Sequence, residues 1–504
     1  MLKELINDLI FYGKYHLELS ELDALYIKNI ILGELNLLSP SEESYFGEEN
    51  VKKMDLPDDL VIKMKEALIN ELNKDEVEAD LLVNKFLGLI SPLPSKVEEN
   101  FFNIYKKDGD EAALDYLYNL SIKNYYFQKT NVNKNIVWDS NFEKRNIEVS
   151  INLSKPEKNN KDVAKLLTAA PVTNYPKCLL CLENLGFKGT AKHPARSNIR
   201  IIPVKLDGAE WFIQYSPFGY FYKHCIVFSK DHKNMIINKS TLKKLCDFVD
   251  QFPSFFIGSN ADLPIVGGSI LNHEHFQGGK HILPAMKQNP EFEFEVKHHK
   301  GVKVYKLDWY NSTILVEGKD AKQVVDVADI ILEAWRKYSD PENDIIASDE
   351  TGNHNTITPS IRKVGDAYKL YLILRNNRCN EEHPDGIFHA HKEHHAIKKE
   401  GIGIIEALGL FILPGRLKRQ KEEIKEILKK WSISGKNPAD LKDLFDFEAM
   451  INYLFDNYNE STIDKDIDKY IENTCKEILI NTAVFKETEK GISGFKKFVN
   501  SLDL

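Results

Sequence analysis

Residues 272–281 collect side chains that suit phosphate chemistry. His273, His275 and Gln277 alternate with Glu274 and Phe276, and alternate side chains of an extended strand share one face. Two imidazoles and a carboxamide on one face form a costly core but a useful catalytic surface. Glycines that let backbone N–H groups approach an anion stand on both sides: Gly267, Gly268, Gly278 and Gly279. The pattern favours a phosphate-handling site over the alternative, a polar sheet face with turn glycines.

Cys178 and Cys181 have the spacing of two thiolate ligands that hold one zinc ion. The other two ligands of a tetrahedral site must come from elsewhere in the chain, and His232 and His273 are candidates. A thioredoxin-like redox pair is the rival interpretation, and it expects a strand–helix–strand context. A lone histidine such as His232 is more often an ordinary surface residue, so the motif alone leaves both interpretations open.

A second group of histidines lies toward the C-terminal end: His383, His389, His391, His394 and His395. We expect His389 and His391 to share a strand face, where they could bind a metal or a phosphate. The alternative is a solvated histidine-rich loop. Basic residues near these groups suit phosphate contacts, although each one alone is more often a surface charge: Arg196, Arg200, Lys398, Lys399 and Arg416.

The composition is that of a folded protein of ordinary charge. The chain has 504 residues, of which 42% are hydrophobic and 28% charged, with a net charge of −9; this excludes a wholly disordered chain. The acidic balance argues against a general nucleic-acid coat, which needs a basic face. No apolar run approaches the roughly 18–20 residues that span a bilayer, and Asn7 and Asp8 interrupt the amphipathic N-terminus, unlike a signal peptide. Six cysteines are too few for a disulfide scaffold and favour a reducing cytoplasm.

The local patterns predict helices that flank a region rich in strands. Helices are expected at 60–74, 110–127 (with Asp110 as N-cap), 239–256 and 320–339, and strands at 198–206, 210–216, 224–229, 259–281 and 367–377. A polar connector is expected at 152–167.

An internal repeat organises these elements. Each block rich in strands contains a helix and then a His-x-His sequence, once at His273 and again at His389, 116 residues further on. We therefore predict an α+β fold with two copies of one unit. The predicted ranges are a helical N-terminal region at 1–165, a first half at 166–290, a second half at 291–430 and C-terminal helices at 431–504.

Several long, irregular stretches carry a specific resemblance to a known family: 151–159, 175–189, 194–203, 214–232, 258–279 and 352–359. On them the chain resembles galactose-1-phosphate uridylyltransferase of the second, bacterial type, a branch of the histidine-triad superfamily. The resemblance covers residues from about 90 to about 420. The first type of the family carries His-Pro-His-Gly-Gln, where this chain reads His-Glu-His-Phe-Gln from 273 to 277.

The resemblance implies two histidine-triad-like halves with antiparallel sheets, plus helical additions at both ends. It also implies transfer of a uridylyl group from UDP-glucose to galactose 1-phosphate through a uridylyl-histidine intermediate. His275 matches the nucleophile and Gln277 the residue that hydrogen-bonds the transferred phosphoryl group. No organic cofactor is expected, the charge and the apolar runs already argue against nucleic-acid and membrane partners, and analogy with the superfamily suggests a homodimer.

The metal and substrate residues also follow from the resemblance. A structural zinc ion would be held by Cys178, Cys181, His232 and His273, and a second metal site would use His389 and His391, with no clear match for its remaining ligands. The substrate-side positions are Arg196, Asn198, Arg200, Ser269, Lys399 and Glu406. Two other functions stay open: a histidine-triad nucleotide hydrolase or dinucleotide phosphorylase, and a catalytically inactive, zinc-stabilised nucleotide-binding protein.

Overall fold

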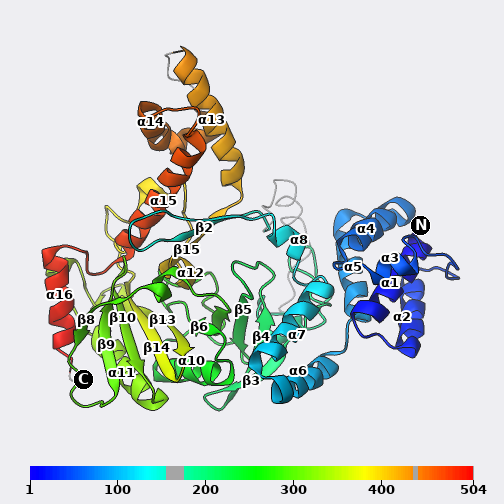
Figure 1. The fold of residues 1–504 in the computed structure, drawn as a ribbon, viewed down its shortest axis with the longest axis horizontal. Helices are drawn as coiled ribbons and strands as arrows, with labels where there is room; N and C mark the ends of the chain where they lie inside the picture. Colours follow the sequence, from blue (N-terminus) through cyan, green and yellow to red (C-terminus); the bar gives the residue numbers. More distant parts are fainter. Residues whose placement is uncertain (155–174, 435–440, 503) are drawn as a thin grey trace. The chain divides into compact units, whose positions relative to one another are not determined.

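The computed structural model describes residues 1–154, 175–434, 441–502 and 504. Figure 1 labels its helices and strands. The described residues form two compact units, each assembled from separate stretches of chain. Unit 1 contains residues 1–133, 175–219 and 223–233, and unit 2 contains the rest. The predicted domain ranges follow chain order, whereas each unit gathers pieces of several of them. The predicted boundary at 165 and most of the predicted connector at 152–167 lie outside the described residues.

Unit 1 begins with helices: α1 (Leu2–His16), α2 (Glu21–Glu34), α3 (Glu48–Lys52), α4 (Asp58–Leu72), α5 (Glu76–Ile90), α6 (Pro94–Asp108), α7 (Asp110–Lys123) and α8 (Lys129–Val132). The helices predicted at 60–74 and 110–127 are confirmed as α4 and α7. The prediction of Asp110 as an N-cap is wrong, because Gly109 occupies that position and Asp110 is the first helical residue. Gly109 has a positive φ of 92°, which glycine adopts without steric cost.

The strands of unit 1 are β3 (Ile202–Leu206), β4 (Ala209–Tyr215) and β5 (Cys225–Ser229), which pair antiparallel. They confirm the strands predicted between residues 198 and 229. Asp207 and Gly208 both have positive φ and form the two-residue turn between β3 and β4, which is the geometry that matches the twist of a hairpin. Helices α6 and α7 pack on β3 and β4, and the Tyr215 hydroxyl donates to the Leu114 carbonyl at 2.9 Å.

The main sheet of unit 2 runs in the order β7-β6-β13-β14-β10-β9-β8, with antiparallel neighbours. These strands are β6 (Phe256–Gly258), β7 (His275–Gly279), β8 (Pro290–Phe294), β9 (Val302–Leu307), β10 (Thr313–Gly318), β13 (Asn355–Val364) and β14 (Ala367–Asn376). Helices α10 (Lys239–Gln251) and α11 (Ala321–Trp335) pack against the sheet and against each other. Most of the predicted strand pattern at 259–281 is irregular, and β7 alone is regular strand there.

The predicted repeat is confirmed at the level of topology. Residues 202–279 run through β3, β4, β5, α10, β6 and β7; residues 290–376 run through β8, β9, β10, α11, β13 and β14, with only the short hairpin of β11 (Ser348–Asp349) and β12 (Gly352–Asn353) added. The repeated histidines are not equivalent. His275 opens strand β7, whereas His389 and His391 lie in an irregular segment after β14, so the prediction that they share a strand face is wrong.

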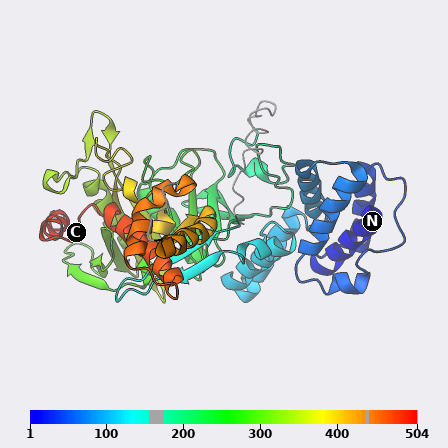
Figure 2. The same ribbon diagram turned by 90° about the horizontal axis from the view of Figure 1, so that it is seen from above.

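The rest of unit 2 is a small sheet and a group of helices. Strands β1 (Ile136–Asp139), β2 (Glu148–Asn152) and β15 (Leu410–Pro414) form the order β1-β2-β15, with β2 and β15 parallel. The helices are α12 (Ile404–Ala407), α13 (Arg416–Ser434), α14 (Glu448–Asp456), α15 (Ile463–Thr482) and α16 (Glu489–Asn500). The orange and red helices α13, α14 and α15 pack together (Figure 2). Among the described helices, none has the length and apolar character that crossing a membrane requires.

Candidate active site

His275 is the first residue of β7 and is 6% exposed. Its ring Nδ1 lies 2.8 Å from the carbonyl oxygen of His273. A carbonyl can only accept, so Nδ1 carries the proton and donates, which leaves the lone pair of a neutral ring on Nε2. The main-chain N–H of His275 donates to Sδ of Met235 at 3.3 Å. The ring and the backbone of this residue are therefore both held in place.

Burial sets the charge of this imidazole. It lowers the pKa of His275 to about 4, and the neighbouring His273 ring acts in the same direction. The side chain is thus neutral around pH 7, which is the form that can attack an electrophilic phosphorus.

Gln277 lies two residues along β7, on the same face as His275, with the fully buried Phe276 on the opposite face. It pairs with Gly258 of the neighbouring strand β6. Gly278 follows where the backbones come close, because a Cβ there would stand 2.3 Å from the Phe256 carbonyl oxygen. A side chain at position 278 would therefore clash with β6, so this strand pairing requires glycine there.

The residue between the two histidines forms an ion pair that the sequence analysis did not find. The Nζ of Lys244, on α10, lies 2.7 Å from Oε1 of Glu274. Both side chains are buried. The sequence contains a signal that Lys244 is buried, because this lysine falls at helical spacing among the apolar or buried residues Thr241, Leu245 and Phe248.

The candidate zinc ligands of unit 1 lie close together. Sγ of Cys178 and Sγ of Cys181 are 3.6 Å apart, and Sγ of Cys181 is 3.1 Å from Nδ1 of His232. Zinc–sulfur bonds of about 2.3 Å at a tetrahedral angle place two thiolates about 3.8 Å apart. Burial raises the pKa of Cys181 to about 11, and a bound zinc ion would reverse this by binding the thiolate. The donor set fits zinc; His273 belongs to unit 2, and its place as fourth ligand stays a prediction.

Asn184 supports the two cysteines and was also missed by the sequence analysis. Its Nδ2 donates to the carbonyl oxygens of Cys178 and Cys181, both at 2.8 Å. Its Oδ1 lies 2.6 Å from Nε2 of His193. This amide therefore fixes the backbone of the Cys-x-x-Cys turn, as residues around metal ligands commonly do.

Asn198 and Arg200 lie in the interior of unit 1. Asn198 is 1% exposed and exchanges amide-to-carbonyl hydrogen bonds with Asn124, at 3.0 and 2.7 Å. The guanidinium of Arg200 donates to the carbonyls of Gly88, Ser91, Pro92, Ser197 and Ile199. These contacts join the 196–200 segment to the helices before it. The half-buried Arg196, by contrast, lies over the ring of Tyr126 at 5.5 Å.

Two predicted substrate residues, Lys399 and Glu406, lie in the second half, and Ser269 belongs to the first half. Ser269 and Lys399 are exposed. Glu406 is buried, and its Oε1 accepts from Nζ of Lys398, not of Lys399, at 2.9 Å. Lys398 also donates to the Ile412 carbonyl. Both lysines were candidates for phosphate contacts in the sequence, but only Lys399 was matched to a substrate position, and it is Lys398 that contacts Glu406.

His389 has a main-chain partner in this segment. Its Nε2 accepts from the N–H of Ile402 at 3.1 Å, and burial lowers its pKa to about 4. Nη2 of the fully buried Arg375 donates to the Ile402 carbonyl at 3.0 Å. Oδ1 of Asn260 accepts from the N–H of Ile404 at 2.8 Å. Three side chains thus fix the backbone of residues 402–404.

His391 stacks on His383 with ring centroids 3.9 Å apart. Within the described part of the chain, neither His389 nor His391 belongs to a group of three or more side chains that could hold a metal.

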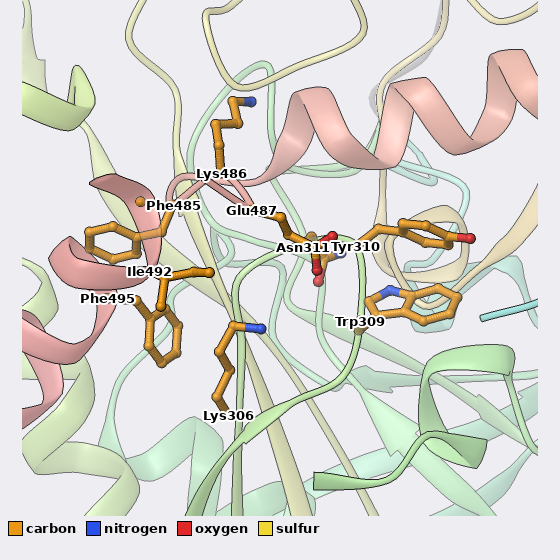
Figure 3. A pocket seen from close by; sticks show the side chains of 10 residues that line it. Lys306, Trp309, Tyr310, Asn311, Phe485, Lys486, Glu487, Ile492 and Phe495 are labelled. Carbon is orange, nitrogen blue, oxygen red and sulfur yellow. The ribbon is translucent and has the colours of Figure 1, made fainter. Parts of the chain in front are cut away.

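A small pocket in unit 2 involves none of the predicted site residues (Figure 3). Trp309, Tyr310, Lys486 and Phe495 are among its lining residues. Lys486 donates to the carbonyls of Ile480 and Asn481 at the end of α15, so it closes a helix end.

The family models and the curated relatives that match this chain all belong to one family. The model of the galactose-1-phosphate uridyl transferase N-terminal domain matches residues 43–234, and that of the C-terminal domain matches residues 247–438. The galactose-1-phosphate uridylyltransferase of Fusobacterium nucleatum is 39% identical over 99% of this chain and 98% of its own. That of Bacillus subtilis is 39% identical over 99% and 97%. The crystal structure of yeast Ap4A phosphorylase covers 66% of this chain and 90% of its own, at 10% identity and a TM-score of 0.30, a score too low to relate the folds.

These matches and the α+β architecture define the class of protein: an enzyme that transfers a nucleotidyl group. The chain belongs to the galactose-1-phosphate uridylyltransferase family.

Proposed function

We propose that the protein transfers a uridylyl group from UDP-glucose to galactose 1-phosphate in two displacements at His275. In the first, Nε2 attacks the α-phosphorus, an N–P bond forms, and the bond to the bridging oxygen breaks with its electron pair leaving on glucose 1-phosphate. In the second, a phosphate oxygen of galactose 1-phosphate attacks, the N–P bond breaks, and UDP-galactose leaves. The observation that carries this proposal is the buried, neutral ring of His275 with Nδ1 bonded to the His273 carbonyl.

The leaving groups need no general acid, because a sugar phosphate departs as a stable anion. The barrier then depends on how charge is stabilised on the oxygens around phosphorus. Gln277 shares the face of His275, and we assign its amide to one of these oxygens. A donor of this kind contributes about 2–4 kcal/mol to the transition state.

We further propose that Cys178, Cys181, His232 and His273 hold a structural zinc ion. Four protein ligands leave no open position on zinc, so the ion would stabilise the geometry around the ligands without activating water. His273 also supplies the carbonyl that orients His275, and metal binding at its ring would restrain that same residue. The second metal site at His389 and His391 remains a prediction.

The proposed substrate residues would act in two ways, either by fixing the backbone or by contacting the substrate. Asn198 and Arg200 would act by fixing the segment that carries Arg196, given their buried main-chain bonds. Ser269 and Lys399 are exposed and would reach substrate directly. Glu406 would do so on the sugar side, held by Lys398.

Isotope exchange tests the transfer against the alternative of a nucleotide hydrolase. Labelled glucose 1-phosphate is incubated with the protein and UDP-glucose, with no second sugar phosphate present. Reversible uridylylation of His275 predicts that label enters UDP-glucose. A hydrolase would release UMP without exchange, and an inactive nucleotide-binding protein would do neither.

We also propose that the enzyme works in the cytoplasm, as a homodimer. The six cysteines, all within the described residues, form no disulfide bond with one another, which supports a reducing cytoplasm. A homodimer is proposed by analogy with the family, and light scattering of the purified protein measures it.

A further inference from the structure

A buried ion pair stands directly beside the nucleophile. Nζ of Lys244 and Oε1 of Glu274 are 2.7 Å apart, and their side chains are 7% and 0% exposed. Taking two charges out of water costs about as much free energy as their attraction returns, so such a pair is weak evidence for a contribution to stability. Its position, between His273 and His275, suggests a different role.

The pair fixes the peptide that orients the nucleophile. The carbonyl of His273, which accepts from Nδ1 of His275, belongs to the peptide unit that leads into Glu274. Rotation of this peptide would move both the carbonyl and the Glu274 side chain. Anchoring the carboxylate on Lys244 therefore restrains the direction of the carbonyl.

Helix α10 is a firm support for this anchor. Asn238 and Thr241 form a reciprocal capping box at its start, and Thr241 Oγ1 donates to the Ile236 carbonyl at 2.7 Å. The adjoining Met235 accepts from the main-chain N–H of His275. The start of α10 and the residues before it thus hold the nucleophile segment at two points.

We infer that Lys244, acting through Glu274, is a positioning residue for His275: it keeps Nδ1 of the nucleophile on the His273 carbonyl and Nε2 directed at the substrate. The inference rests on the proposed function, since it assigns a role in uridylylation. Lys244 touches neither the substrate nor the reacting atoms in this role. A misplacement of about 1 Å at a reacting centre costs on the order of 100-fold in rate.

The test is a double-mutant cycle with Lys244→Met, Glu274→Gln and the double variant. The rate of uridylyl-enzyme formation is measured in single turnovers with UDP-glucose, below the melting temperature of each variant. Each single variant is expected to lose on the order of 10- to 100-fold in this rate, with little change in KM for UDP-glucose. The double variant should be no slower than the slower single variant, because the two residues act as one unit.

Two comparisons separate positioning from a general effect on folding. The exposed Lys239 lies on the same helix, 2.7 Å from the half-buried Asp326, so Lys239→Met should leave the rate unchanged. Lys244→Arg keeps the charge and should retain more of the rate than Lys244→Met, and it also serves if the Met variant does not fold.

Wild-type uridylylation rates in folded Lys244→Met and Glu274→Gln, with only the melting temperature lowered, would overturn the inference. So would losses in the two single variants that add in the double variant, or a Lys244→Arg variant as slow as Lys244→Met. Absence of a uridylyl adduct in the wild-type protein would instead refute the proposed function, and the two failures are distinguishable.

Discussion

At the scale of single residues, the proposed attack by His275 depends on which ring nitrogen carries the lone pair. The His273 carbonyl occupies Nδ1, and burial removes the proton that would otherwise block Nε2 at mildly acidic pH. The carbonyl oxygen of His273 thus determines the tautomer of the His275 ring, and burial determines the charge of that ring. Neither effect needs a second titrating side chain to act as a base.

The lowered pKa of His275 predicts an unusual pH profile. Protonation removes the nucleophilic lone pair, and with a pKa of about 4 the ring stays neutral at every higher pH. The single-turnover rate of uridylylation should therefore be nearly constant from about pH 8 to about pH 5, whereas an ordinary histidine titrates near 6.5. A rate that falls by half near pH 6.5, while circular dichroism shows an intact fold, would contradict this.

Gln277→Ala should slow catalysis without preventing binding. Loss of one donor to charge that develops in the transition state costs about 100- to 1,000-fold in kcat. KM for UDP-glucose should change far less, because the contact strengthens mainly in the transition state. Steady-state kinetics measure both, with Gln251→Ala on α10 as a control; an equal rise in KM at constant kcat would assign Gln277 to ground-state binding.

At the scale of elements, side chains outside the reacting groups fix short pieces of backbone. Asn184 does this for the Cys-x-x-Cys turn, and His389, Arg375 and Asn260 do it for residues 402–404. Each case joins residues that are distant in sequence to a segment with a proposed role.

Asn184→Ala is expected to weaken zinc binding, because it frees the turn that presents Cys178 and Cys181. Residues around metal ligands typically contribute about 10- to 100-fold in affinity. The purified wild-type protein should contain one zinc ion per chain, and competition with a chelator should strip the variant at a lower chelator concentration. Cys379→Ser, which changes an exposed cysteine, serves as the control; equal zinc retention in Asn184→Ala would refute the role.

His389→Ala tests the function of the irregular histidine segment. The substitution removes the acceptor of the Ile402 N–H, and a buried unpaired donor costs about 1–3 kcal/mol. The melting temperature should fall relative to that of the exposed-site control His298→Ala. The metal content should stay equal to that of the wild type; a lost metal equivalent would instead support the predicted second metal site.

At the scale of the whole molecule, the sequence predicted those helices and strands whose apolar residues recur at a regular spacing. The helices α4, α7, α10 and α11 and the strands β3, β4 and β5 follow from the periodicity of the sequence. The repeat was predicted for a partly wrong reason: strand order repeats, but His389 and His391 do not lie on a strand. Nothing in local spacing separates a histidine that opens a strand from one that accepts a main-chain bond.

Contacts between residues far apart in the chain could not be predicted from the sequence alone. Lys244 and Glu274 are 30 residues apart and meet only because α10 packs near the start of β7. Arg200 matched a substrate position in the sequence, but its guanidinium bonds the carbonyls of Gly88, Ser91 and Pro92, more than 100 residues earlier in the chain. The division into two units, each of several stretches, likewise depends on tertiary contacts that composition does not record.

The most direct test of the account is mass spectrometry of the enzyme mixed with UDP-glucose alone and quenched under conditions that preserve an N–P bond. We predict one uridylyl group per active chain, on the peptide that contains His275, and its disappearance when galactose 1-phosphate is added before quenching. No adduct, or an adduct on any other side chain, would contradict the central claim.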